Sequence, residues 1–270
     1  VQQGWWSQDC TADFDFARAY VDPGTPLQLS HIRLQRSRQL LAQADEVDVP
    51  TARRILRDHY EDTFLGGPYF NAAVPDFLTL CMHSHPSDFT WGDTAASTIF
   101  VLPTADEAGR RLPHLWWSPV TPCTGVYVPV FVDAGAVPET VAAAGTAGTA
   151  GTAGTAGHRP CRPEDAPKDA FDARSYWWRF RDLLERCKGT GTDEGPGAPD
   201  FDRNQPVVRE AFDALEQRWA ARLPEVEREA ISLRDRGREE EMRGLLRAFT
   251  EDCVAEALKT VDALAVELGR

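Results

Sequence analysis

Apolar side chains recur every three or four residues in several parts of the chain, which is the spacing of one face of an α-helix. The segment 30–44 begins at Ser30, a residue type suited to cap a helix, and carries leucines and an isoleucine among arginines and glutamines. A second helix is expected to start at Thr51, directly after Pro50, and to run over residues 51–60. Two amphipathic helices are therefore predicted before residue 61.

The second half of the chain is predicted to be mainly helical. Residues 171–187 combine aromatic and leucine side chains at helical spacing, and one apolar stripe runs from Met242 to Leu268. The steps of this stripe do not hold a strict heptad, so we expect it to pack on the sheet or on a neighbouring helix of the same chain.

Between these helical regions the pattern changes to short runs of β-branched and aromatic residues, each bounded by Pro, Gly or Asp. These runs predict four strands, at 77–83, 97–102, 115–117 and 126–132. The run 126–132 is almost continuously apolar, as expected for a strand covered on both faces, so we place it centrally in a sheet.

The order of elements indicates the fold class and the domain organisation. Helices come first, strands follow and helices return, which favours an α+β fold over a doubly wound parallel sheet. We divide the chain into a core α+β part at 1–142, a linker or disordered loop at 143–168 and a helical region at 169–270 that packs on the core. The linker contains an Ala-Gly-Thr repeat, which has no side chain large enough to bury.

Composition narrows the class of partner. The 270 residues include 42 acidic and 29 basic side chains, a net charge of −13, which argues against a nucleic-acid partner. No run reaches the ~20 apolar residues that cross a bilayer, and the first residues have no signal-peptide pattern. The six cysteines form no C-x-x-C pair, which is typical of reduced thiols. We therefore expect a cytoplasmic protein with neither a membrane nor a nucleic-acid partner.

One candidate for metal chemistry is the run that contains His83, His85 and Asp88. If the strand at 77–83 continues, both histidines project from one face, which suits two imidazole ligands on a metal ion. A metallohydrolase at these three residues is thus one alternative. The spacing departs from the H-x-H-x-D-H signature of metallo-β-lactamase-like hydrolases, because Asp88 is one position too far and no histidine follows it. We expect structural or pocket histidines here, and no metal or cofactor.

Two cysteines and a hydroxyl-rich segment are further candidates. Cys81 and Cys123 lie beside histidines or turns and could act as nucleophiles if a neighbour lowered the thiol pKa, although buried inert thiols are the interpretation we favour. At 94–98 the short hydroxyl side chains of Thr94 and Ser97 can either line a pocket or bond to nearby backbone groups.

The succession of short motifs carries more information than any one of them. In chain order these are Cys81-Met82-His83, Thr94-Ala95-Ala96-Ser97, Val101-Leu102-Pro103, Thr121-Pro122-Cys123-Thr124-Gly125-Val126-Tyr127-Val128-Pro129-Val130 and Asp133-Ala134-Gly135. This order resembles the carboxy-terminal half of the secernins and related bacterial cysteine dipeptidases, which pass from a Cys-Met-His strand through a Thr-Ala-Ser strand to a Pro-Cys-Thr strand. The likeness extends over residues 5–188, with further familiar segments at 13–20 and 175–178, and is interrupted by the Ala-Gly-Thr insertion.

The resemblance implies part of an N-terminal-nucleophile hydrolase, a four-layer αββα sandwich, with a dipeptide or small amide as substrate. In that family a cysteine at the mature amino terminus attacks the amide carbonyl, its own α-amino group serving as base. Cys10, Cys81 and Cys123 are internal and cannot supply an α-amine, so the nucleophile is expected in an absent amino-terminal segment. His83, Thr94 and Ser97 are the candidates for the substrate pocket.

The resemblance also has a structural consequence. Without the amino-terminal half, the apolar strand faces near 126–132 are expected to be exposed unless an amino-terminal segment or a partner chain covers them. Besides the dipeptidase and the metallohydrolase, a noncatalytic diverged member or binding module of the same fold is the other class that we consider.

Overall fold

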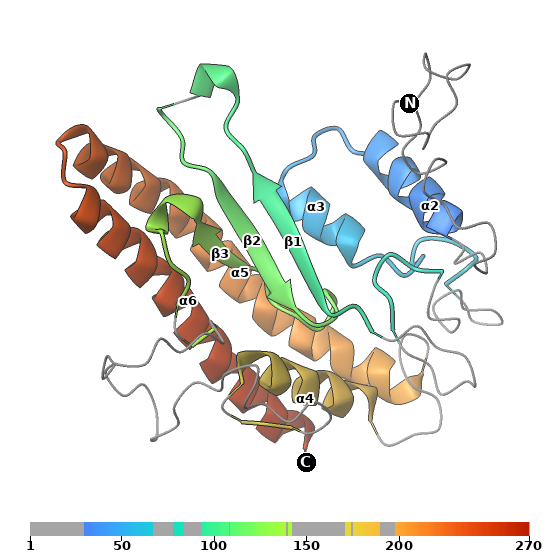
Figure 1. Ribbon diagram of the computed structural model, residues 1–270. Coiled ribbons are helices and arrows are strands. Elements are labelled where there is room, and N and C mark those ends of the chain that lie inside the picture. Colours follow the sequence, from blue (N-terminus) through green and yellow to red (C-terminus); the bar gives the residue numbers. More distant parts are fainter. Residues whose placement is uncertain are drawn as a thin grey trace, which may run out of the picture.

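The computed structural model describes residues 30–66, 78–83, 93–107, 109–138, 140–141, 171–173, 175–189 and 198–269. Within these ranges the chain forms five α-helices and one three-stranded antiparallel sheet, which confirms the α+β class (Figure 1). The expected linker at 143–168 lies outside the described residues, as does the amino-terminal part of the family likeness.

Two short helices precede the sheet, α2 at Ser30–Ala42 and α3 at Val49–Leu56. The prediction that the second helix starts at Thr51 was wrong, because Pro50 lies inside its first turn. Asp48 caps this helix by accepting a hydrogen bond from the Thr51 backbone N–H at 2.8 Å. Proline is tolerated there since the first helical N–H groups have no partner within the helix.

The sheet consists of β1 at Ala96–Val101, β2 at His114–Pro119 and β3 at Val128–Phe131, in the order β1-β2-β3. Three of the four predicted strands are thus confirmed. Ile99 pairs with Trp116, and Trp116 pairs with Pro129. The run 126–132, which forms β3, was predicted to be the central strand. This prediction was wrong, because β2 lies in the middle and β3 at an edge of the described sheet.

The apolar character of β3 comes from a helix that covers it. Helix α6, at Glu239–Leu268, packs on this strand, with the rings of Phe131 and Phe249 6.2 Å apart and the Thr250 hydroxyl donating to the Pro129 carbonyl at 3.1 Å. Residues 126–128 are at most 1% exposed. The expectation that strand faces near 126–132 would be exposed was therefore wrong for these residues, although Val132 remains 56% exposed.

The strand predicted at 77–83 is not formed over residues 78–83, where 78–81 make bends and 82–83 are irregular. Its backbone is held by separate contacts: the Cys81 N–H donates to the Asp58 carbonyl at 3.3 Å, and Met82 exchanges two hydrogen bonds with Thr94. These partners, Asp58 and Thr94, belong to two different segments, so the hydrogen bonds do not continue as a regular β-ladder.

Three helices form the second layer. Helix α4 spans Tyr176–Lys188, α5 spans Pro199–Asp235, and α6 returns alongside α5 after a tight turn at Gly237 (Figure 1). Helix α4 starts later than the predicted residue 171, at the Ser175 cap. The apolar stripe of the last helix is confirmed, because its inward side chains are buried against the core, among them Met242, Leu246, Phe249, Cys253, Ala257, Val261 and Leu264.

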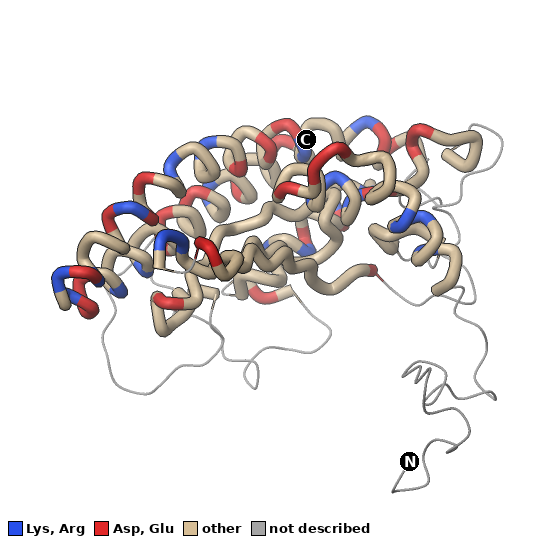
Figure 2. The backbone as a smooth tube through the Cα atoms, turned by 90° about the horizontal axis from the view of Figure 1, so that it is seen from above, with Lys and Arg blue, Asp and Glu red and all other residues tan. Residues whose placement is uncertain are grey.

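Strands and helices share one continuous hydrophobic core. The helical layer lies on one side of the sheet, as the two perpendicular views show (Figures 1 and 2). The sheet face that bears Trp116 and Phe131 is buried, whereas on the opposite face Phe100 is 62% exposed and Leu115 is half-buried. No helix among the described residues combines the length and the apolar character needed to cross a bilayer.

Candidate functional site

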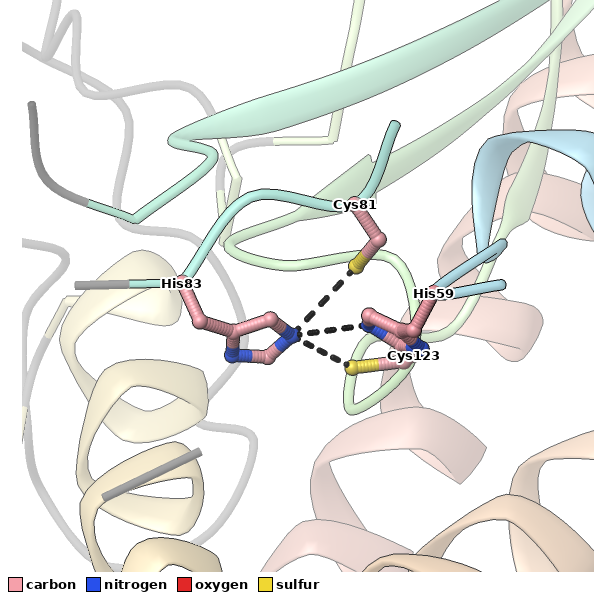
Figure 3. A group of neighbouring side chains, drawn as sticks. All are labelled: His59, Cys81, His83 and Cys123. Carbon is pink, nitrogen blue, oxygen red and sulfur yellow. Dashed lines mark hydrogen bonds between the residues drawn. The ribbon is translucent and has the colours of Figure 1, made fainter. Parts of the chain in front are cut away.

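Four side chains meet at the end of the sheet: His59, Cys81, His83 and Cys123 (Figure 3). His59 follows α3, Cys81 and His83 lie in the irregular segment before β1, and Cys123 lies in the loop between β2 and β3. All four are buried, and one ligand atom from each lies within 4.8 Å of the others. We refer to these four residues as the thiol–imidazole cluster.

The cluster converges on one atom, Nε2 of His83. This nitrogen lies 3.1 Å from Nε2 of His59, 3.2 Å from Sγ of Cys123 and 3.6 Å from Sγ of Cys81 (Figure 3). Sequence separations of 24 and 40 residues divide His83 from His59 and Cys123, so tertiary structure alone brings them together. On its other side His83 contacts the edge of the Phe201 ring, and its Nδ1 is buried with no hydrogen-bond partner among the described residues.

Two strained backbone positions flank the ligands. Tyr60, next to His59, has φ of 67°, and Val120, three residues before Cys123, has φ of 51°; they are the non-glycine residues with positive φ in the described part of the chain. This conformation is unfavourable for a bulky or β-branched residue and persists only where surrounding contacts enforce it. Both loops are therefore held in a specific shape at the cluster.

The loop that carries Cys123 is tightly packed and anchored. A Cβ at Gly125 would lie 2.2 Å from the Ser118 hydroxyl, so only glycine fits there. Arg209 donates to the carbonyls of Pro122 and Gly125, and Arg57 donates to the Pro122 carbonyl at 2.9 Å. These bonds fix the backbone on both sides of the Cys123 thiol.

The two arginines are in turn oriented by a buried carboxylate. Glu216 of α5 is 1% exposed and accepts from Arg57 at 2.6 Å and from Arg209 at 3.4 Å. It also accepts from Arg53 at 2.9 Å and from the Tyr127 backbone N–H at 2.8 Å. Several charged donors satisfy its oxygens, which offsets the cost of burying the charge.

The electrostatics of the cluster favour a thiolate on Cys123. Burial by itself raises the pKa of a thiol, but hydrogen bonds from Cys81 and the two histidines hold the pKa of Cys123 well below its usual range. The pKa of Cys81 is raised, mainly by burial. Burial acts to lower the pKa of His59, yet its bonds to Cys123 and Glu61 raise it to about 10.

A carboxylate lies behind one imidazole. The Nδ1 atom of His59 is 2.8 Å from Oε1 of Glu61, whose other oxygen accepts from the His59 backbone N–H at 2.8 Å. Such a carboxylate fixes the ring orientation and directs Nε2 toward the other three residues.

A pocket of about 610 Å³ adjoins the cluster on the side of α2, α3 and α5. Most of its lining residues are charged. Guanidinium groups, such as those of Arg54 and Arg57, lie there together with carboxylates, such as those of Asp62 and Asp213. Cys123 is one of the residues that line the pocket.

The structure separates the predicted site residues. His83 is in the cluster, whereas Thr94 accepts from the Met82 N–H at 3.0 Å and Ser97 lies 2.6 Å from the Tyr127 hydroxyl. None of the three lines the pocket of about 610 Å³. His85 and Asp88, which complete the alternative metallohydrolase site, lie outside the described residues.

Sequence reasoning missed His59 as a member of the site. The available signal was the carboxylate two positions later, in His59-Tyr60-Glu61, which can orient the imidazole. That signal is weak in a chain with 42 acidic residues.

We compared the chain with known proteins. No protein-family model, curated protein or solved structure matches this chain. The proposed function therefore rests on the residues of this chain and on the contacts that they make.

Proposed function

We propose that this chain is the carboxy-terminal portion of a secernin-like cysteine dipeptidase, a cytoplasmic amide hydrolase whose nucleophile is supplied by an amino-terminal segment. The observation that carries this proposal is that three motifs of the family resemblance, at 81–83, 94–97 and 121–130, are in mutual contact in the folded chain.

Hydrogen-bond contacts connect three of these motifs. Met82 of the Cys-Met-His motif pairs with Thr94 of the Thr-Ala-Ala-Ser motif. Ser97 of that second motif lies within hydrogen-bond distance of Tyr127, and His83 contacts Cys123 of the Pro-Cys-Thr motif. These residues resemble one family and also contact one another in the fold. The two properties together support a common origin with that family better than either property does by itself.

The two-layer arrangement is consistent with half of an αββα sandwich. One face of the sheet is covered by helices, while the opposite face presents Phe100 at 62% exposure together with half-buried Leu115 and Trp117. An apolar sheet face of this kind packs on a second sheet in sandwich folds. In our proposal the amino-terminal half supplies that sheet.

The charged pocket suits a zwitterionic substrate. A free dipeptide ends in an ammonium and a carboxylate, and the pocket of about 610 Å³ offers carboxylates such as Asp62 and guanidinium groups such as Arg54. These residues would hold the two ends of the substrate. The amino-terminal thiolate would then attack the amide carbonyl, and the C–N bond would break as the second amino acid leaves as a protonated amine. Water would hydrolyse the resulting thioester, which releases the first amino acid and regenerates the thiol. The free state of the four described cysteines is consistent with a reducing compartment.

The test is hydrolysis of a panel of dipeptides by two preparations: the 270-residue chain alone, and the chain coexpressed with any segment that is encoded in frame upstream of Val1. We expect turnover only in the second preparation, and its loss when the amino-terminal cysteine is replaced by alanine. Turnover by the isolated chain that disappears in Cys123→Ala would contradict the proposal. No turnover in either preparation would favour the noncatalytic binding module.

A further inference from the structure

We propose that the thiol–imidazole cluster is a closed zinc(II) site, in which Nε2 of His59 and His83 and Sγ of Cys81 and Cys123 bind one ion. This site is independent of the hydrolase proposal, and its role would be structural. It replaces the expectation from sequence that the chain binds no metal.

Hydrogen bonding alone does not account for the arrangement. A neutral imidazole nitrogen has either one N–H or one lone pair, so Nε2 of His83 can make one well-directed hydrogen bond. Three heavy atoms nevertheless lie within 3.6 Å of it. Four donor atoms grouped this closely are what a metal ion at their centre requires.

The three distances from Nε2 of His83 to the other donor atoms fit a tetrahedral ion. Zinc lies ~2.0–2.1 Å from nitrogen and ~2.3 Å from sulfur, which places two nitrogens ~3.3 Å apart and a nitrogen and a sulfur ~3.5 Å apart in a regular tetrahedron. The observed separations are 3.1 Å for the two Nε2 atoms, and 3.2 and 3.6 Å for the contacts of His83 with the two sulfurs. Two thiolates and two imidazoles are also a ligand set that zinc prefers.

Residues around the cluster hold the ligand side chains in position, as the residues that contact the ligands do in metal sites. Glu61 bonds to Nδ1 of His59, the carboxylate–histidine pairing that orients a metal-binding ring and increases its basicity. The strained conformations of Tyr60 and Val120 lie beside two of the ligands, and Arg57 and Arg209 fix the carbonyl of Pro122 next to Cys123.

The site is closed and buried. All four positions are filled by protein, and each of the four side chains is buried, so no coordination position is left for substrate or water. Its ligands come from three irregular segments, which explains what the ion would do: it would cross-link loops that have few regular hydrogen bonds of their own.

The first measurement is the zinc content of the purified 270-residue chain, after removal of any affinity tag, by inductively coupled plasma mass spectrometry. We expect about one zinc per chain, falling at least about tenfold in Cys81→Ser and Cys123→Ser. Cys253→Ser is the matched control, because Cys253 is equally buried, at 0% exposure, but lies in α6 outside the cluster; it should keep its zinc. Zinc that persists in Cys123→Ser would overturn the proposal.

A second measurement remains decisive even if the serine variants fail to fold. Cobalt(II) loaded into the wild-type chain should give the intense visible bands and the sulfur-to-metal charge-transfer band of tetrahedral thiolate coordination. Cys81 and Cys123 should also resist alkylation in the native protein until a chelator is added. A wild-type chain that takes up neither ion, or whose Cys123 is alkylated at once, would show that the cluster is not a metal site.

The supporting carboxylate gives a graded test. Glu61→Gln keeps the shape of the side chain but removes its charge, and we expect it to raise the zinc dissociation constant by about 10-fold to 100-fold. Glu107→Gln, at a partly exposed carboxylate outside the cluster, is the control and should leave zinc affinity unchanged. Equal affinities in the two variants would argue against His59 as a ligand.

Discussion

The helical layer and the cluster end of this protein are stabilised by different means. Helices α5 and α6 bury aromatic and aliphatic side chains along their length, among them Phe212, Trp219 and Leu246 at 0% exposure. The cluster end consists of loops whose shape depends on Arg57, Arg209, the buried Glu216 and the four residues of the cluster. Apolar burial tolerates approximate packing, whereas paired charges and ligands require specific atoms at specific distances.

The largest expected effect comes from metal removal, which should affect the two regions unequally. With zinc about a thousandfold above its dissociation constant, the ion contributes about 4 kcal/mol to the free energy of unfolding. A chelator should therefore lower the denaturant midpoint while leaving most helical circular dichroism intact before the transition. An unchanged midpoint would show that the cluster stabilises the fold without an ion.

Removal of the buried carboxylate at position 216 should have the next largest effect. Glu216→Gln removes the buried negative charge that pairs with Arg53 and Arg57 and leaves Arg57 with Asp213 as its remaining carboxylate partner, which costs about 3–5 kcal/mol of unfolding free energy. Urea unfolding measures the change. Glu229→Gln, an exposed position on the same helix, serves as control and should change stability by less than about 0.5 kcal/mol.

A cavity in the helical layer tests whether the two regions are separable. Leu246→Ala removes a side chain with 0% exposure and should cost about 2–5 kcal/mol of unfolding free energy. Zinc content should remain at the wild-type level, because Leu246 contributes no ligand. Val266→Ala, at 58% exposure, is the matched control on α6. Loss of zinc in a folded Leu246→Ala would mean that the regions are coupled.

The smallest effect is expected at the cap of α3, the helix that leads to His59. Asp48→Ala removes the bond to the Thr51 N–H and should cost about 1 kcal/mol of unfolding free energy, whereas Asp48→Asn should retain most of it. That hydrogen bond lowers the pKa of Asp48, so the carboxylate stabilises the folded state above the unfolded pKa of about 3.9. The stability difference between wild type and Asp48→Ala should shrink as pH falls through the lowered pKa of the folded state.

The periodicity of the sequence was sufficient for the regular elements. The apolar stripe of α6 and the apolar runs of β1, β2 and β3 were predicted, since each element buries side chains at its own repeat. The prediction failed where apolar character had more than one possible cause. The run 126–132 is apolar because α6 covers β3, a contact between segments more than a hundred residues apart, and a single sequence does not distinguish this from a central strand.

The candidate site was determined by tertiary structure. The sequence indicated Cys81, His83 and Cys123 as residues of reactive type, but nothing in their spacing placed them together or added His59. The strained loops at Tyr60 and Val120 and the anchoring of Pro122 by two arginines bring the four side chains to one point. Sequence periodicity reports burial within an element, while the convergence of loops depends on long-range contacts that have no repeat along the chain.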